Sequence, residues 1–438
     1  MKILLIGSGS KEHALVWKLL ASEKYRNLEL IAIPGNKALR KFVQCIEDVD
    51  INDVNRLLEI AIARQINLTI VGESKLLAKG IVDKFQEAGK LIFGPRAAAA
   101  EIESSNVFAK DFMIRHNIPS ARFASFDQLN MALTFVGTIS YPIAIRIDKK
   151  FDNEKSYFIA EDLKEARQVL KEVFKQKFLV VQKPRVTIEE LIEGHQFTLN
   201  FICDGERALS LLPVQGYRDP QNLDIYYDRG AYAPTPLITD SIMYKIRNFI
   251  INPLIKGLAD EGRPYSGILA LDLALDIKDG LQIKLIQCRT NFADSDAQVV
   301  LPLLDEDLVD IYLAVANNDL SFYKNGFHKY LGSALSINVV NEAETINPLN
   351  PLQGNYMLDE INERIEKLSS DLNGIPLVFY GTKTSSISSH EKAHAEIFGA
   401  TAVAESLLDA QIMAYKLADT LIIPSKSFKK DIGDQGLI

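Results

Sequence analysis

The sequence predicts a multidomain protein that joins a parallel α/β domain to mixed α+β domains. Its 438 residues are too many for one ordinary core, and at about 150 residues per domain they predict two to four domains. The N-terminal part alternates apolar runs with helical segments, which is typical of a parallel sheet covered by helices. Farther along, short β-rich segments with occasional helices between them indicate mixed α+β structure.

The N-terminal part reads as a series of βα units. Residues 1–6 predict a strand, the loop Gly7-Ser8-Gly9 follows it, and leucines at helical spacing predict a helix after the loop. Further strands are expected at residues 28–33, 68–71 and 90–93, with a helix at 54–64. The breaker Pro95 and the capping signal Ser105-Asn106 place the first domain boundary near residue 103.

The remaining elements are shorter and less regular. Strands are expected at residues 142–147, 156–160, 178–181, 198–203 and 208–214, and helices at 162–175 and 239–261. A turn at residues 317–319 precedes the last segment, where we expect strands at 334–340 and 377–380 and a helix at 406–417.

Composition restricts the partners of the chain. Hydrophobic residues make up 47% and charged residues 24%, the balance of a folded globular protein. The net charge of −8 argues against non-specific nucleic-acid binding, because neutralising phosphates requires a basic face. The three cysteines, Cys45, Cys203 and Cys288, match no disulfide or zinc spacing and indicate a reducing compartment. No apolar run reaches the roughly 20 residues of a membrane span or has the pattern of a signal peptide, so we predict a cytoplasmic protein with no membrane partner.

The loop Gly7-Ser8-Gly9 is the first candidate binding feature. Glycines let backbone N–H groups approach a phosphate at a helix N-terminus. The last glycine of the dinucleotide fingerprint would fall at Glu12, so that fingerprint is incomplete. Taken alone, the loop is better explained as a tight βα turn than as a binding site.

Several motifs together carry a family resemblance. They are GSGSKEH (residues 7–13), PGN (34–36), IVGE (70–73), FGP (93–95), IEELIEG (188–194), FGATA (398–402) and KDIG (430–433). With these motifs the chain resembles, over nearly its whole length, the phosphoribosylamine–glycine ligase family of the ATP-grasp superfamily. The resemblance implies an N-terminal α/β domain at 1–103, an ATP-grasp domain at 104–327 with a mobile lid at about 120–188, and a small α+β C-terminal domain at 328–438.

The resemblance also implies an activity. The family joins glycine to 5-phosphoribosylamine through a glycyl phosphate, and it releases glycinamide ribonucleotide, ADP and phosphate in purine biosynthesis. Only small-molecule substrates are implied, and we expect a monomer or small homo-oligomer.

An ATP site follows from the same resemblance. Arg146 and Lys155 are expected to contact the phosphates, although residues 148–155 have lost every glycine of the family's phosphate loop and Asn106 replaces a family lysine. The adenine hinge is expected at Glu189, Glu190, Leu191 and Ile192.

The metal site departs most from the family pattern. ATP-grasp chemistry implies Mg²⁺ or Mn²⁺ between the β- and γ-phosphates, held in the family by a Glu and an Asn two residues apart. Without gaps these positions become Gln287 and Arg289, and with a two-residue insertion they become Leu285 and Gln287. Asp272 lies on the preceding strand, where other ATP-grasp enzymes carry a metal-binding carboxylate. We therefore predict Asp272 and Gln287 as metal ligands, with a solvent-facing Asp272 as the equal alternative.

The remaining site residues concern the substrates. A phosphoribosyl phosphate in an acidic protein requires basic or backbone donors. We assign this role to Gly7, Gly9, Lys11, Arg218 and Arg229. Arg289 and Asp294 are assigned to the acyl-phosphate region as catalytic residues. Because the departures gather at the phosphate and metal positions, a non-catalytic paralogue and a ligase with a different acceptor remain open as alternatives.

Overall fold

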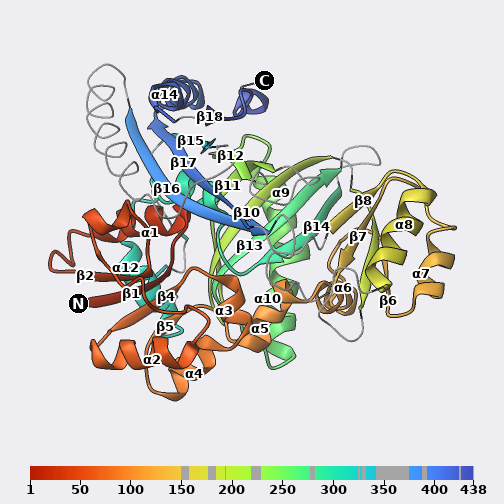
Figure 1. Cartoon of the computed structure of the whole chain (residues 1–438), viewed down its shortest axis with the longest axis horizontal. Coiled ribbons are helices and arrows are strands. Elements are labelled where there is room, and N and C mark those ends of the chain that lie inside the picture. The colour runs from red at the N-terminus through yellow and green to blue at the C-terminus, as the bar shows by residue number, and fades with distance from the viewer. Residues whose placement is uncertain are drawn as a thin grey trace.

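The described part of the computed structural model forms three β-sheets with helices around them (Figure 1). It describes residues 1–148, 157–175, 184–192, 194–218, 228–276, 282–323, 326–327, 332–341, 374–386, 392–423 and 426–437. No helix in these ranges combines the length and the apolar content that a membrane span requires.

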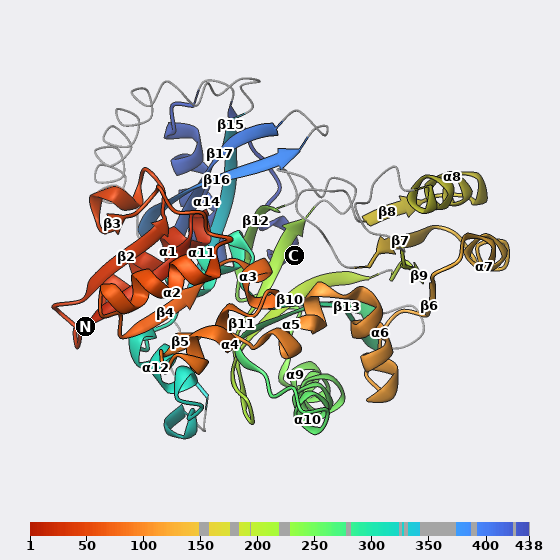
Figure 2. The same cartoon turned by 60° about the horizontal axis from the view of Figure 1, so that its bottom comes forward.

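The N-terminal part is the parallel α/β unit that the sequence predicts. Its sheet has the order β3-β2-β1-β4-β5. The strands are β1 Lys2–Gly7, β2 Glu29–Pro34, β3 Gln44–Cys45, β4 Leu68–Val71 and β5 Ile92–Phe93, and the helices are α1 Ser10–Leu20, η1 Leu39–Lys41, α2 Val54–Ala63, α3 Ser74–Ala78, α4 Ile81–Glu87 and α5 Ala97–Ser104. Alternate β1 residues pack in one core with α1 and in another core with α2 and α4. Figure 1 and Figure 2 show these helices around the N-terminal sheet. The apolar run of β1 is continuous because both of its faces are buried.

The central part is built on an antiparallel sheet. Its strands are β10 His195–Asp204, β11 Ala208–Arg218, β12 Asp228–Ala233, β13 Ser266–Asp276 and β14 Gln282–Arg289. Its helices are α6 Asn106–Arg115, α9 Asp240–Ile246, a π-helical turn Arg247–Ile251, α10 Asn252–Asp260, α11 Asp294–Val300, α12 Leu308–Ala316 and η3 Ser321–Tyr323. Phe197, Leu199 and Phe201 pack in the same core as α9 and α10, so Thr198 and Asn200 face the opposite side of the sheet.

We call the central antiparallel sheet and its helices the body. A four-stranded sheet, which we call the lid, lies to one side of the body (Figure 1). Its order is β6-β9-β7-β8. The strands are β6 Phe123–Phe126, β7 Ile143–Ile147, β8 Tyr157–Ala160 and β9 Val186–Glu190, and the helices are α7 Leu129–Phe135 and α8 Leu163–Phe174. The lid has a hydrophobic core of its own. The strand expected at 178–181 lies outside the described residues.

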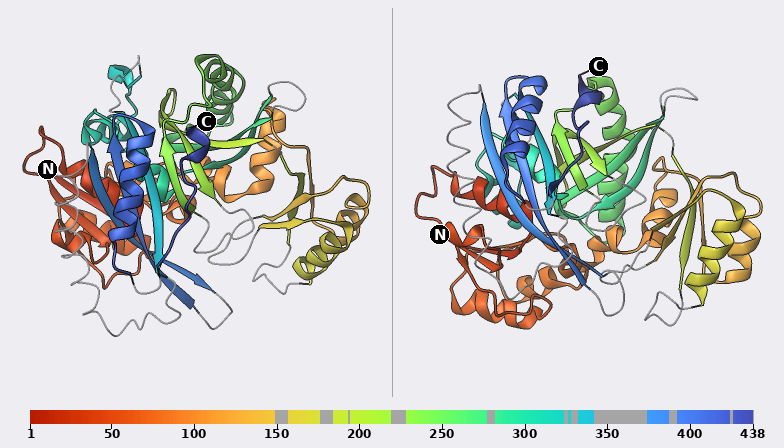
Figure 3. Two further views of the ribbon diagram at one scale, coloured as in Figure 1. Left: turned by 90° about the horizontal axis from the view of Figure 1, so that it is seen from above. Right: turned by 45° about the horizontal axis from the view of Figure 1, so that its top comes forward.

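The C-terminal strands continue the central sheet. They are β15 Ser333–Asn341, β16 Ile375–Ser386, β17 Lys392–Ala404 and β18 Lys426–Ser427, with α14 Leu407–Thr420 and η4 Asp434–Gly436. Strand β15 pairs with β12, which makes one sheet of nine strands (Figure 3). Strand β16 reaches the start of α1, where the Tyr380 backbone N–H donates to His13 Nδ1 at 2.9 Å. A side chain at Gly381 would overlap the Ser10 backbone, so this glycine allows the close approach.

Candidate active site

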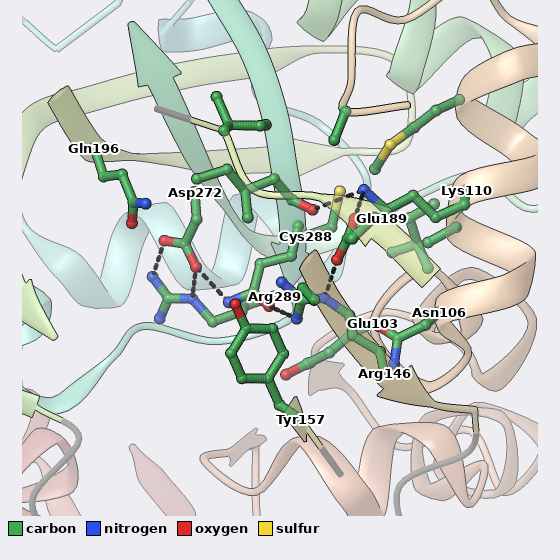
Figure 4. A pocket seen from close by; sticks show the side chains of 18 of the residues that line it. Glu103, Asn106, Lys110, Arg146, Tyr157, Glu189, Gln196, Asp272, Cys288 and Arg289 are labelled. Carbon is green, nitrogen blue, oxygen red and sulfur yellow. Dashed lines mark hydrogen bonds and ion pairs between the residues drawn. The ribbon is translucent and has the colours of Figure 1, made fainter. Parts of the chain in front are cut away.

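A cavity of about 280 Å³ lies between the lid and the central sheet (Figure 4). Strands β7, β8 and β9 line it from the lid, and α6, β13 and β14 line it from the body. It brings together eight residues that the sequence analysis selected: Arg146, Glu189, Glu190, Leu191, Ile192, Asp272, Gln287 and Arg289. These residues come from separate parts of the chain, so the convergence is a property of the fold.

Glu189 lies at the centre of one flank of this cavity. Its buried carboxylate accepts from Lys110 Nζ at 2.5 Å and from Arg146 Nε. Burial alone would raise the pKa of Glu189, but the two cations outweigh burial and lower that pKa to about 2. Glu189 therefore stays ionised and holds two cations at the junction of lid and body. The sequence assigned Glu189 to adenine binding, whereas its side chain in the structure is turned toward these cations.

Lys110 is a site residue that the sequence analysis did not select. Its side chain is 3% exposed, and it projects from α6 toward Glu189. A signal was present, because Lys110 lies three residues from both Val107 and Met113, which are buried on the same helix. A lysine in the middle of an apolar helical face needs a buried partner, and this criterion would have identified it.

Arg146 connects the lid to the body. Besides Glu189 it contacts Gln287, whose Oε1 accepts from Arg146 Nη1 at 3.2 Å. The guanidinium also lies over the Tyr157 ring, 4.5 Å from its centroid. A planar guanidinium can keep such a stacked position while its edge donates hydrogen bonds. The positive charge predicted at this position therefore lines the cavity in a defined orientation.

Asp272 is at the centre of the other flank, and its carboxylate is fully hydrogen-bonded. Oδ1 accepts from Thr198 Oγ1 at 2.8 Å and from Arg289 Nη2 at 2.9 Å. Oδ2 accepts from Gln287 Nε2 at 2.7 Å and from Arg289 Nε at 3.1 Å. An ionised carboxylate has about four acceptor sites, so these donors use its capacity. The alternative of a solvent-facing Asp272 is wrong, because the residue is buried.

Arg289 lies between two carboxylates. Its bidentate contact with Asp272 is joined by a third bond, from Nη2 to Asp296 Oδ2 at 3.0 Å. Asp296 belongs to α11 and is completely buried. Figure 4 shows Asp272 and Arg289 on one side of the cavity and Lys110 and Glu189 on the other, with Arg146 between them.

The described residues do not form a donor set for a divalent metal ion. Within the described ranges, no group of three or more His, Cys, Asp or Glu side chains is placed to hold one. Of the two predicted ligands, Asp272 is saturated by hydrogen bonds, and Gln287 offers a neutral amide oxygen that accepts from Arg146. Magnesium prefers hard, anionic oxygen ligands in an octahedron, and this arrangement does not supply them.

Four of the remaining candidates form a second group outside the cavity. Gly7 ends β1, Gly9 precedes α1, and Lys11 and Asp294 lie close to them. The Gly9 backbone N–H donates to Glu12 Oε2 at 2.7 Å, and a Cβ built on Gly9 would lie 3.4 Å from Asp294 Oδ1. Asp294, which the sequence analysis assigned with Arg289 to the acyl-phosphate region, lies next to the glycine loop and does not line the cavity.

Helix α11 links the two groups. Asp294 in its first turn lies beside Gly9, while Asp296 in the same turn binds Arg289. One turn later Gln298 Nε2 donates to Ser10 Oγ at 2.9 Å, which ties α11 to the start of α1. The glycine loop and the cavity are therefore held against each other by one short helix.

Three predicted residues give less information. Lys155 and the side chain of Arg218 lie outside the described residues. Arg229 is in β12, next to Asp228, whose carboxylate accepts from the Ser295 backbone N–H at 3.0 Å. The chain at Arg229 is thus anchored to the first turn of α11.

The buried carboxyl of Glu12 leads to a prediction about pH. Burial raises its pKa from 4.5 to about 7; Lys11 opposes this shift, and Glu73 and Asp294 add to it. The folded state therefore binds the proton more tightly than the unfolded state does. This contribution to stability is complete below pH 4.5 and is lost as the pH rises toward about 7.

Urea unfolding of wild type and Glu12→Gln over this pH range will test the prediction. The variant lacks the titrating group, so the stability of wild type relative to the variant should fall as the pH rises. Parallel pH profiles for the two proteins would contradict the assignment.

Comparisons with known proteins agree with this architecture. The family model "Phosphoribosylglycinamide synthetase, N domain" matches residues 1–103, and "Phosphoribosylglycinamide synthetase, ATP-grasp (A) domain" matches residues 104–297. The phosphoribosylamine–glycine ligase of Vibrio parahaemolyticus is 31% identical over 99% of this chain and 98% of its own length. That of Xylella fastidiosa is 36% identical over 73% of this chain and 74% of its own length.

Solved structures share the fold at low sequence identity. Phosphoribosylamine–glycine ligase from Thermotoga maritima superposes with a TM-score of 0.73 at 19% identity, covering 99% of this chain and 100% of that chain. The biotin carboxylase domain of the Hydrogenobacter thermophilus 2-oxoglutarate carboxylase, solved with MgADP, ADP and bicarbonate, gives a TM-score of 0.67 at 14% identity, covering 97% of this chain and 91% of that chain.

Proposed function

This chain belongs to the phosphoribosylamine–glycine ligase family, and we propose that the cavity between lid and body is its ATP site. The protein is an ATP-dependent ligase of purine biosynthesis that joins glycine to 5-phosphoribosylamine and forms glycinamide ribonucleotide, ADP and phosphate. The convergence of the eight predicted residues on this cavity is the observation that supports placing the ATP site there.

The reaction requires positioning and charge neutralisation rather than a nucleophilic side chain. The glycine carboxylate attacks the γ-phosphorus, which breaks the bond to ADP and forms an acyl phosphate. The nitrogen of the ribosylamine then attacks the acyl carbon, and phosphate leaves. A cavity that fixes the reactants, carries cations near the transferred group and excludes water suits both steps.

The described residues divide this work in the following way. Arg146, with Lys110 held behind it by Glu189, supplies positive charge to the phosphates. Leu191 and Ile192 follow the end of β9 and line the cavity, which supports a role for their backbone in binding adenine. Lys155 stays a prediction for the phosphate group.

We place the ribosylamine on the side of the glycine loop. Gly7 and Gly9 are at the carboxyl end of β1, and open α/β sheets bind ligands at this end of their strands. The raised pKa of Lys11 supports a cation there: burial opposes the charge, but Glu12, Glu73 and Asp294 outweigh burial. Arg218 and Arg229 stay predictions for the phosphate of this substrate.

The proposal includes magnesium only as an ion bound to the nucleotide, not as an ion held by protein side chains. Magnesium bound to the nucleotide would neutralise phosphate charge in this chemistry. The described side chains do not fit a protein-held ion, so no step is assigned to one. The cytoplasmic location and the monomeric or small homo-oligomeric state stay predictions.

The test of the function is an assay of ADP release with each substrate omitted in turn. We expect release only when glycine and 5-phosphoribosylamine are both present. Release with another amine or carboxylate, but not with this pair, would identify a ligase with a different acceptor. ATP binding without release in any combination would identify the non-catalytic paralogue.

A further inference from the structure

We propose that the Arg289 guanidinium, locked between Asp272 and Asp296, takes the place of a protein-held divalent ion. The chain would then bind the polyphosphate of ATP with little dependence on a divalent metal. This inference rests on the proposal that the lid–body cavity is the ATP site. Three features of the cavity carry it.

The first feature is the saturation of Asp272. Four donors fill its two oxygens, and two of these donors belong to Arg289. A metal ion could bind this carboxylate only after displacing some of these hydrogen bonds. Each displaced donor would lose a hydrogen bond to a charged acceptor, which costs free energy.

The second feature is the rigidity of the guanidinium. Arg289 is held by a bidentate contact to Asp272 and by a further bond to Asp296, and its side chain is 14% exposed. Two carboxylates from different elements, β13 and α11, therefore fix one cation at the cavity wall. A cation fixed before the ligand arrives needs no reorganisation to meet developing negative charge.

The third feature is a continuous chain of hydrogen bonds across the cavity. Arg146 donates to Gln287 Oε1, and Gln287 Nε2 donates to Asp272, which binds Arg289. Glutamine suits this position because its amide can accept from one side and donate to the other. A metal ion bound by Gln287 and Asp272 would break this chain at both residues. The Arg289 guanidinium therefore completes this chain of hydrogen bonds without a metal ion.

Calorimetric titration of the full chain with ATP, once with EDTA and once with excess MgCl₂, tests the inference. For wild type we expect dissociation constants within about threefold of each other. Arg289→Gln should weaken ATP binding in EDTA by about tenfold to a hundredfold, the range for one charged hydrogen bond. In this variant Asp272 regains acceptor sites, so MgCl₂ should recover part of the loss. Arg289→Lys, which keeps the charge but not the bidentate fork, should bind between the two.

Arg263→Gln is the matched control. Arg263 also bonds a carboxylate, that of Glu101 at 2.7 Å, but it lies outside the cavity lining. It should bind ATP like wild type, and thermal melting of each variant will show whether it is folded. Wild-type binding that requires magnesium, or a folded Arg289→Gln that binds ATP in EDTA like wild type, would overturn the inference.

The assay also separates this inference from the proposed function. Titration with ATP needs neither glycine nor the amine. Metal-free ATP binding without ligation would refute the function and support the inference. Ligation accompanied by strictly magnesium-dependent ATP binding would support the function and refute the inference.

Discussion

Replacing Glu189 by alanine should lower the free energy of unfolding by about 3–5 kcal/mol, as expected when one partner of a buried ion pair is removed. The reason is that Lys110 and Arg146 would both lose their carboxylate, and Lys110 is almost completely shielded from water. Urea unfolding at neutral pH measures the effect. The deficit should shrink as the pH falls from 4.5 toward about 2, because the depressed pKa of Glu189 stabilises the fold only while the group is ionised.

Glu261→Ala is the matched control for this prediction. Glu261 also contacts two basic side chains, Arg115 at 2.9 Å and His116 at 2.8 Å, but this group is partly exposed. Exposed ion pairs contribute roughly 0–1 kcal/mol, so the control should be destabilised much less. Equal decreases in the free energy of unfolding of the two variants would mean that the buried Glu189 ion pairs stabilise the fold no more than the exposed pairs do.

Replacing Arg146 by methionine should weaken ATP binding, and lower kcat/KM for ATP, by about a hundredfold. The variant keeps an apolar stem to pack on the Tyr157 ring but loses the guanidinium that meets Glu189 and Gln287. Both the direct charge on the phosphates and the alignment of Gln287 would be lost. Titration with ATP measures the affinity, and steady-state kinetics at varied ATP measure kcat/KM.

Arg185→Met is the control within the lid. Arg185 is exposed, its contact with Asp148 is 3.8 Å long, and it does not line the cavity. Its removal should leave the affinity for ATP nearly unchanged. If Arg146→Met bound ATP as tightly as Arg185→Met, the phosphates would have to lie elsewhere.

Prediction from sequence succeeded where short-range patterns decide the structure. The apolar run of β1, the glycine loop after it and the helical spacing of α1 lie within the first 20 residues, and the structure has them as expected. The helix expected at 239–261 is also present, although a π-helical turn at Arg247–Ile251 interrupts it. The sequence also provided eight of the residues that line the cavity, because the family resemblance lies in contiguous motifs.

The sequence by itself therefore determined the parallel N-terminal sheet and, through the resemblance, the family. Only the tertiary structure decided what the charged side chains bind. Arg146 and Gln287 are 141 positions apart, and Thr198 and Asp272 are 74 apart. Residue type alone left Asp272 open as a metal ligand or a surface residue, and the fold made it the partner of Arg289. The physical reason is that the charge state and partners of a buried ionisable group depend on neighbours brought close only by folding.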